Sequence, residues 1–445
     1  MGGRVRRVSA AGRPALAFVV FVFLALVACS LPAAEQRGQS GPDIVIGAPV
    51  SFTGNQATEG ALTRQGYDMW LDWVNGQGGI DVHGVRHRVQ IKYEDDQSKA
   101  DLSARLAEKL ISQERVQFLL GPYGSSTTAA VAPVAEQHRM PMVEGNGAAQ
   151  IIFSKGYRYV FGVLSPAEKY LQGVLDMAAN LNPKPTRIAI LSADDNFSLE
   201  VAKGVLDYAP RRGMEVVFYQ QYADGSTNLY GPLNQAKAKN PDILLNSGHL
   251  LEAVAINKAA RDLRLDSKIF AYSVGPSTPV FTGALGKDAD YVFSGSQWTS
   301  QVKYRPSFYL GTPQYVAAYR KKFNSKEDPD YHVAESTAAC LALHKAIETA
   351  GSLQPEQVRD ALATLDVTTF YGRIKFDSRG ANIFKPMVVE QIQQGRHQTV
   401  WPPEVMSAAA LYPTPKWTVR AGLPPLEEQP RGPKLPGSGR PPGDG

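Results

Sequence analysis

The chain has 445 residues, of which 43% are apolar and 20% are charged, and this composition excludes a disordered or fibrous protein. It is too long for one ordinary core, so we expect two globular lobes with terminal extensions. The formal net charge is +5, but four arginines and no acid precede Cys29, so the rest of the chain carries only +1. A nearly neutral chain without basic runs excludes the electrostatic footprint of nucleic acid binding.

Residues 1–28 have the pattern of an export signal. A basic stretch, residues 1–13, precedes an apolar run, residues 14–28, that is too short for a comfortable membrane span. The run ends in Leu26-Val27-Ala28, and the next residue, Cys29, completes a tetrapeptide that resembles the lipobox of bacterial lipoproteins. This resemblance implies cleavage before Cys29, lipid attachment to its thiol, and a tether over residues 29–42. The alternative is an uncleaved membrane anchor in which Cys29 is incidental.

The spacing of cysteine and histidine indicates no metal site. Cys29 and Cys340 are the two cysteines, so lipidation of Cys29 leaves no intramolecular disulfide. Cys340 stands in an apolar helical run and is predicted to be a small core residue. The chain contains neither CxxC nor HExxH, and its seven histidines are scattered. We therefore predict no metal and no cofactor.

Strands and helices alternate from residue 43 onward, and the alternation then starts again. The first series has strands at 44–50, 89–94 and 116–120, with helices at 61–74, 101–112 and 126–137. The second has strands at 187–191, 215–219, 242–245 and 269–272, with helices at 167–181, 199–211, 230–239 and 251–263. Strict alternation predicts parallel sheets covered on both faces. The fold class is therefore α/β, with two doubly wound, Rossmann-like lobes.

After residue 298 the pattern changes to consecutive helices, at 314–323, 334–350 and 355–365, and then to a hairpin-like pair at 374–376 and 387–393. The tail from residue 402 holds 11 of the 31 prolines and is expected to be largely disordered. We predict three crossover segments, near 164, near 295 and at 366–372. They divide the chain into lobe 1, residues 43–163 and 296–366, and lobe 2, residues 164–295 and 367–401.

Several stretches resemble, in order and spacing, the Leu/Ile/Val-binding group of type I periplasmic binding proteins. They are IGAPVSFTGNQATEG, DMWLDWVNGQGGI, FLLGPYGSSTTAAVAPVAEQHRMPMVEGNGA and YGRIKFDSRG. The resemblance extends from residue 43 to about residue 417. It implies two lobes that close on a small solute, a permease and its ATPase as partners, and a location in the periplasm or on the outer face of the cell membrane. We expect a monomer that catalyses no reaction.

A cluster of hydroxyl residues marks the first part of the predicted site. Ser125, Ser126 and Thr127 open a helix directly after a buried strand, where free N–H groups and the helix dipole favour a carboxylate. The alternative is an ordinary capping cluster with no ligand. The resemblance adds the next loop, with Asn146, Gly147 and Ala148, although Ala148 replaces the threonine usual in the family. Glu144 is expected at the rim or behind the site.

The resemblance places the other half of the site on lobe 2. Phe197 matches an aromatic residue that covers the ligand, and His249 follows the next strand in a similar position. Ser277 stands where amino acid receptors hold a glutamate for the ligand's ammonium group, and an ammonium buried without a partner costs several kcal/mol. His332 matches another contact position. With the aromatics Trp298, Tyr304, Tyr309 and Tyr331 near the cleft, the sequence favours an aromatic or apolar carboxylate over an α-amino acid.

Three alternatives remain open from the sequence. The first is binding of a branched-chain amino acid or amide, with Glu144, Asp194 or Asp195 as counter-ion. The second is a sensor on the same fold, which hands its closed form to a membrane receptor. The third, an enzyme, is disfavoured because no GxGxxG follows the first strand and no Walker loop, GxSxG elbow or metal signature occurs.

Overall fold

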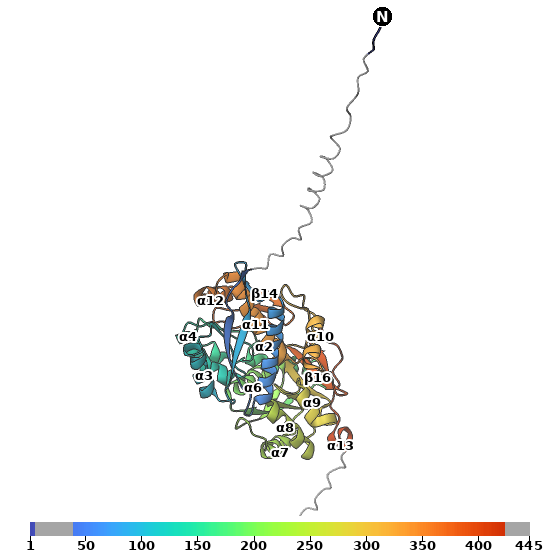
Figure 1. Ribbon diagram of the computed structural model, residues 1–445. Coiled ribbons are helices and arrows are strands. Elements are labelled where there is room, and N and C mark those ends of the chain that lie inside the picture. Colours follow the sequence, from blue (N-terminus) through green and yellow to red (C-terminus); the bar gives the residue numbers. More distant parts are fainter. Residues whose placement is uncertain (5–38, 423–445) are drawn as a thin grey trace, which may run out of the picture. The chain divides into compact units, whose positions relative to one another are not determined.

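The structure is a computed structural model that describes residues 1–4 and 39–422 (Figure 1). It divides into two units, residues 1–40 and residues 41–445. The first unit holds strand β1 (Gln39–Ser40), and the second holds every other helix and strand described. The predicted lipidation site Cys29 and most of the predicted signal segment and tether lie outside the described residues.

The first sheet of the second unit has five parallel strands in the order β5-β2-β6-β7-β8. Their bounds are β2 (Ile44–Val50), β5 (Val89–Asp95), β6 (Phe118–Leu120), β7 (Met142–Glu144) and β8 (Val160–Gly162). The first three helices around it are α2 (Ala57–Gly76), α3 (Ala100–Ser112) and α4 (Ser125–Gln137). Because helices cover both faces, strands such as β2 are apolar and buried along nearly their whole length.

The second sheet has seven strands in the order β10-β9-β11-β12-β13-β16-β17. The first five are parallel, and β16 and β17 add antiparallel strands at one edge. The strand bounds are β9 (Arg187–Ala193), β10 (Glu215–Tyr222), β11 (Ile243–Ser247), β12 (Ile269–Tyr272), β13 (Val292–Ser296), β16 (Val388–Gln393) and β17 (Arg396–Trp401). Around them are η2 (Ala167–Lys169), α5 (Gln172–Ala178), α6 (Asn196–Tyr208), η3 (Ala209–Arg212), α7 (Tyr230–Ala238), α8 (Leu250–Asp262), α9 (Pro279–Leu285) and η4 (Gly286–Ala289).

Both sheets have the same doubly wound order, in which the second strand along the chain lies at the edge and the first lies inside it. The predicted fold class is therefore confirmed. We call the first sheet and its helices lobe 1, and the second sheet and its helices lobe 2. The chain passes between the lobes after β8, after β13 and before β16.

Three later helices pack on lobe 1, and the longest of them lies against α2 (Figure 1). They are α10 (Thr312–Phe323), α11 (Tyr331–Ala350) and α12 (Pro355–Ala363). Gly66 permits the close approach of α2 and α11, because a Cβ there would lie 2.4 Å from the Val333 carbonyl oxygen. Cys340 is fully buried within α11, so its predicted role as a small core residue is confirmed.

The predicted hairpin between residues 374–376 and 387–393 is wrong. Strand β15 (Gly372–Lys375) pairs instead with β14 (Asp366–Thr369), and β16 pairs with β17. Gln394 and Gly395 both have positive φ, 53° and 73°, which suits the tight turn between β16 and β17. The third crossover also comes later than 366–372, because Ala381 still bridges Gly162 of the first sheet.

Other local predictions differ from the structure in smaller ways. The predicted helix at 167–181 is a 3-10 turn, η2, followed by the short helix α5. The antiparallel pair β3 (Ile80–Val82) and β4 (Val85–His87) and the strands β8, β13 and β17 were not predicted from the sequence. A further 3-10 turn, η1 (Gln150–Ile152), also follows β7. These strands have three to six residues, too few for a period-two pattern to separate them from loops.

The prediction of disorder from residue 402 onward does not hold for residues 402–422. This segment ends in the short helix α13 (Trp417–Arg420), whose Trp417 ring is buried. The Trp417 backbone N–H donates to Asp266 Oδ1 and its indole N–H donates to the Leu265 carbonyl, both at 2.9 Å. The Arg420 guanidinium lies 4.0 Å from the Trp417 ring centroid. One large ring with a matching pocket thus fixes a segment whose composition indicated disorder.

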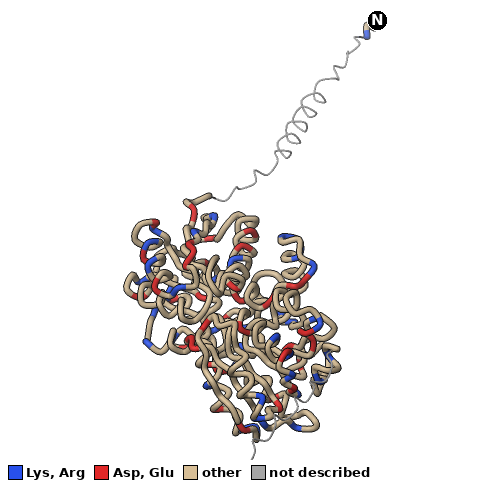
Figure 2. Tube along the Cα trace, turned by 90° about the horizontal axis from the view of Figure 1, so that it is seen from below, with Lys and Arg blue, Asp and Glu red and all other residues tan. Residues whose placement is uncertain are grey.

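Charged residues of both signs are distributed along the trace (Figure 2). Many of them form pairs on the surface, such as Lys92 with Glu114, whose Nζ and Oε2 atoms lie 2.5 Å apart. Pairs of this kind contribute little to stability, so the fold depends on its buried apolar strands and helices.

Candidate ligand-binding site between the two lobes

The candidate site lies where the carboxyl ends of strands from both sheets face each other. In doubly wound sheets, ligands bind outside the carboxyl ends of the strands, at the point where the strand order reverses. Tyr123 and Gly124 follow β6 in lobe 1, whereas Phe197 follows β9 and His249 follows β11 in lobe 2. The two sheets therefore contribute matching edges to one site.

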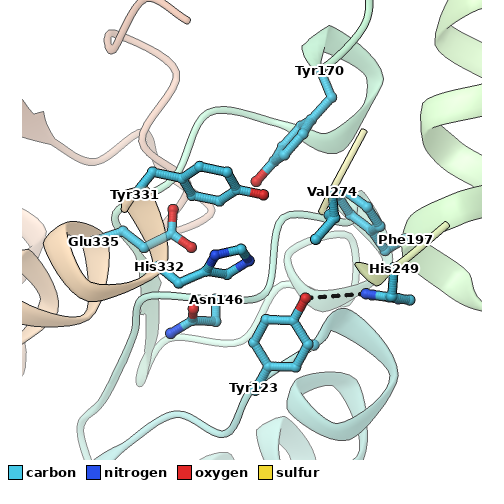
Figure 3. A pocket seen from close by; sticks show the side chains of 10 residues that line it. Tyr123, Asn146, Tyr170, Phe197, His249, Val274, Tyr331, His332 and Glu335 are labelled. Atoms are coloured by element: carbon cyan, nitrogen blue, oxygen red, sulfur yellow. Dashed lines mark hydrogen bonds between the residues drawn. The ribbon is translucent and has the colours of Figure 1, made fainter. Parts of the chain in front are cut away.

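Ten residues line a cavity between these edges (Figure 3). They are Tyr123, Gly124, Asn146, Tyr170, Phe197, His249, Val274, Tyr331, His332 and Glu335. The free space inside is about 10 Å³, room for about one water molecule. A larger solute can therefore enter only if the lobes move apart or the rings turn.

Aromatic rings from both lobes form most of the cavity wall. The rings of Tyr170 and Phe197 meet edge to face, with centroids 4.9 Å apart and planes at 85°. The Tyr331 and His332 rings stack at 4.1 Å, and the Tyr123 ring lies 5.5 Å from that of His332. Rings in such arrangements contribute dispersion and quadrupole attraction to an apolar or aromatic guest.

His249 forms a buried ion pair with Asp195 at one end of the cavity. Its Nε2 lies 3.5 Å from Asp195 Oδ1, and its Nδ1 lies 3.1 Å from the Tyr123 hydroxyl of the other lobe. Burial alone would lower the pKa of His249, but the charge of Asp195 raises it to about 10. Asp195 is fixed because it caps α6 and accepts hydrogen bonds from the backbone N–H groups of Phe197 and Ser198. Asp195 thus favours the protonated form of His249, and the two groups form a buried ion pair.

Asn146 and His332 offer fixed polar atoms to the cavity. The Asn146 amide nitrogen donates to Ser336 Oγ at 2.8 Å, while its Oδ1 is buried without a hydrogen-bond partner in the described chain. His332 Nδ1 lies 2.6 Å from Asp330 Oδ2, and that contact sets the orientation of the ring. Both side chains are thus held in place before any ligand arrives.

Glu335 is a cavity residue that the sequence reading missed. It lies one helical turn after Tyr331 on α11, so both side chains project from the same face of the helix. Its carboxylate is buried, and burial together with the charges of Asp330 and Glu144 raises its pKa well above the usual range. The four-residue spacing from Tyr331 within a predicted helix is the signal that would have located it.

Four of the predicted contact residues line the cavity, namely Asn146, Phe197, His249 and His332. The structure places the other six outside the lining set. Ser125 Oγ accepts hydrogen bonds from the Ala148 and Ala149 N–H groups, both at 3.1 Å. The Thr127 hydroxyl donates to the carbonyls of Tyr123 and Gly124. Ser125 thus joins α4 to the loop after β7 and Thr127 bonds back to the loop after β6, while the N-cap residue of α4 is Gly124, without a side-chain cap.

The remaining predicted residues support the walls or lie elsewhere. Ser126 Oγ accepts from the Asn196 N–H at 3.4 Å, a contact between the lobes. Gly147 has no space for a side chain, since a Cβ there would lie 2.8 Å from Ile152 Cδ1. Ala148 is buried beside it. Ser277 faces a second, larger cavity of about 640 Å³, which shares Tyr331 with the first.

Glu144 organises the loop after β7 from behind the cavity. Its Oε2 accepts hydrogen bonds from the N–H groups of Asn146, at 2.9 Å, and Gly147, at 2.5 Å. The side chain is fully buried, and burial raises its pKa to about 8. It therefore acts through the loop and not as part of the cavity lining.

Direct contacts between the lobes surround the cavity. Asn55 Nδ2 donates to Asp224 Oδ2 at 3.1 Å, and the Leu250 N–H donates to Glu59 Oε1 at 3.1 Å. The Gln150 N–H donates to Glu200 Oε2 at 2.7 Å. Together with the Tyr123–His249 contact, they stabilise an arrangement in which the lobes are closed.

Two sheets of equal strand order that face each other across a ring-lined cavity are the architecture of the type I periplasmic binding proteins. The model of the periplasmic binding protein family matches residues 43–397. The chain belongs to this family. Within the described residues, none of the helices combines the length and apolar character needed to cross a membrane.

Relatives of known sequence and structure agree with this assignment. The Leu/Ile/Val-binding protein homolog 8 of Brucella abortus is 24% identical, with 81% of this chain and 91% of the relative covered. The leucine-binding protein LivK of Thermotoga maritima shares the fold with a TM-score of 0.73 at 20% identity, covering 81% of this chain and 99% of that one. A solute-binding protein of Rhodopseudomonas palustris in complex with benzoate has a TM-score of 0.71 at 17% identity, covering 83% and 97%.

Proposed function

We propose that this periplasmic binding protein is the extracytoplasmic receptor of an ABC importer, and that its lobes close on a small carboxylate with an aromatic or apolar body. The observation that carries the proposal is the ring-lined cavity with the His249 imidazolium at one end. Of the buried His249–Asp195 ion pair, His249 alone lines the cavity, so it is the group that can give a carboxylate a charge-assisted hydrogen bond, and the rings accommodate the apolar body. The receptor catalyses no reaction in this proposal.

Closure of the lobes is the proposed mechanism. In an open form the cavity residues are wet, and a ligand that bridges the lobes shifts the population toward the closed form. The contacts Asn55–Asp224, Glu59–Leu250 and Gln150–Glu200 form only when the lobes meet, so they add to the stability of the closed form. A membrane permease would recognise the closed outline.

Membrane attachment through a lipid on Cys29 is part of the proposal. The tetrapeptide that ends at Cys29 supports it, as does the apolar run that precedes it. Each buried methylene contributes about 0.8 kcal/mol, so several acyl chains would hold the receptor firmly on the membrane. Neighbouring genes for a permease and an ATPase would separate import from a sensory role.

Whether the ligand carries an ammonium group depends on which acidic side chains the cavity offers as its counter-ion. Ser277 supplies no carboxylate, and it lies in the second cavity. Asp195 is already paired with His249, and Glu144 is behind the wall. A specific observation nevertheless favours a second candidate, a branched-chain amino acid, because Glu335 does place a carboxyl group in the cavity. Glu335 therefore joins Glu144, Asp194 and Asp195 as a possible counter-ion, and His249 at the other end of the cavity supports the carboxylate.

Calorimetry with matched ligands decides between the two candidates. The pairs are phenylalanine with 3-phenylpropanoate and leucine with 4-methylpentanoate, which differ only in the α-ammonium group. The proposal predicts that the acid of each pair binds at least about tenfold more tightly, a difference of about 1.4 kcal/mol. Tight binding of either amino acid with a much weaker deaminated partner would contradict it and assign Glu335 as the counter-ion.

A further inference from the structure

Glu335 lies opposite the cation in the ligand cavity. Its side chain, 1% exposed, points into the cavity from the first turns of α11, across from His249 (Figure 3). The two groups therefore give the cavity two polar ends, one positive and one acidic, with rings between them. A ligand that fills the cavity meets both ends.

The acidic end has few internal partners. The Tyr371 hydroxyl lies 3.5 Å from Glu335 Oε2, at the limit of a hydrogen bond. Lys385 is buried nearby, but its Nζ donates to the carbonyls of Gln297 and Pro386 and lies 4.2 Å above the Tyr371 ring. Within the described part of the chain, no cation forms an ion pair with Glu335.

The Tyr331 hydroxyl is a second unpaired group in the cavity. It is buried and makes no hydrogen bond to any described residue, and Figure 3 shows it pointing from α11 into the cavity toward the Tyr170 hydroxyl, with the Tyr331 ring next to Glu335. Buried polar groups are nearly always hydrogen-bonded, so two poorly paired groups at one wall point to a ligand. Together they offer one acceptor and one group that both donates and accepts.

We propose that Glu335 is a specificity-determining residue, and that the ligand is an aromatic or apolar carboxylate with a hydroxyl group at the end away from its carboxylate. The ligand hydroxyl donates to Glu335 and accepts from Tyr331, while its carboxylate meets His249. This inference rests on the proposed function. It goes further because it names a second polar group on the ligand and the side chains that select it.

A hydroxyl fits this end better than an ammonium group. Burial and the charges of Asp330 and Glu144 favour the neutral form of Glu335, and an ammonium would require its ionised form. A hydroxyl pairs with either form. A ligand that lacks the hydroxyl leaves Glu335 and Tyr331 desolvated without partners, and sites built around a substrate hydroxyl reject such analogues strongly.

Calorimetric titration of the purified full chain with benzoate and 4-hydroxybenzoate tests the proposal. The wild type should bind 4-hydroxybenzoate at least about tenfold more tightly than benzoate. Glu335→Met, which keeps the length of the side chain and removes its oxygens, should lose that preference, so that the affinities for the two acids lie within about threefold of each other. Glu348→Met is the matched control, because Glu348 lies on the same helix and outside the cavity.

Tyr331→Phe supplies a second variant that removes only one oxygen and keeps the ring. It should reduce the preference for the hydroxylated acid even if Glu335→Met folds poorly. Equal wild-type binding of the two acids, or a preference retained in both variants, would overturn the inference while leaving the proposed function intact. Tighter binding of 4-(aminomethyl)benzoate than of 4-hydroxybenzoate would also overturn it, since Glu335 would then serve a cation. If neither benzoate binds, calorimetry with 3-phenylpropanoate separates the two failures: binding of that acid overturns this inference alone, and no binding of it refutes the proposed function.

Discussion

Glu144→Gln should make the protein more stable at alkaline pH and leave it nearly unchanged at acidic pH. Burial raises the pKa of Glu144 from 4.5 to about 8. Between these values the folded state binds more protons than the unfolded state, so stability falls as pH rises. The slope is about 1.4 kcal/mol for each pH unit, and the whole interval amounts to about 5 kcal/mol.

Glutamine imitates the neutral form of Glu144. Its amide oxygen can accept from the N–H groups of Asn146 and Gly147, and it never ionises. Urea unfolding of wild type and variant at pH 5, 7 and 8 measures the difference in the free energy of unfolding. The variant should agree with the wild type within about 1 kcal/mol at pH 5 and exceed it by several kcal/mol at pH 8. A difference that stays constant over this range would refute the reasoning.

Glu348→Gln is the control for the titration of Glu144. Its pKa is lowered, chiefly by the hydrogen bond with His344, so its ionised form is stabilised by folding. That contribution is present above the unfolded pKa and is lost as pH falls. The control should therefore lose stability near neutral pH, the opposite direction from Glu144→Gln.

Three other predictions follow from particular residues. Cys29→Ala should release the protein from membranes or leave its precursor uncleaved, which fractionation and immunoblotting show; wild type without lipid on Cys29 would rule out the anchor. Ser125→Ala should destabilise the fold by about 1 to 3 kcal/mol, because the Ala148 and Ala149 N–H groups lose their acceptor. Ligand affinity should fall only as far as the loss of these two hydrogen bonds displaces the loop after β7. Trp417→Ala should cost about 3 to 5 kcal/mol in chemical denaturation, and a loss within 0.5 kcal/mol would show that the segment is not anchored by this ring.

The order of strands and helices made the fold predictable. Strands such as β2, β9 and β11 are short apolar runs bounded by turn residues, and a helical pattern follows each of them. Such alternation permits few arrangements, because connections are short and parallel strands need crossovers. The hairpin pairing was mispredicted because both β15 and β16 have a closer partner in sequence, and local turns decide which strands pair.

The candidate site was predictable at the level of strand ends and not at the level of side-chain direction. Phe197 and His249 follow strands that end at the switch point, so topology brings them to the cavity. Ser125 and Thr127 stand at an equally favourable point, but their hydroxyls turn back to backbone groups. A Ser or Thr side chain at the start of a helix can hydrogen-bond either to nearby backbone groups or to a ligand, and residue spacing alone does not distinguish the two cases.

Glu335 was missed for a related reason. A single glutamate in a long helical pattern usually lies on the solvent face, and its four-residue spacing from Tyr331 becomes informative only when Tyr331 is known to face the cleft. The order of residues 402–422 was not predicted for a different reason. The burial of Trp417 depends on contacts with Leu265 and Asp266, about 150 positions earlier in the chain.

Ligand-driven closure is the central claim, and cross-linking between the lobes tests it most directly. Asn55 Nδ2 and Asp224 Oδ2 lie 3.1 Å apart across the lobes, near the surface, so a short bifunctional thiol reagent can bridge the double variant N55C/D224C only when the lobes are closed. An aromatic carboxylate such as 3-phenylpropanoate should accelerate formation of that cross-link severalfold, while phenylalanine at the same concentration should not. A cross-linking rate that no carboxylate changes, or one that rises with phenylalanine alone, would contradict the account.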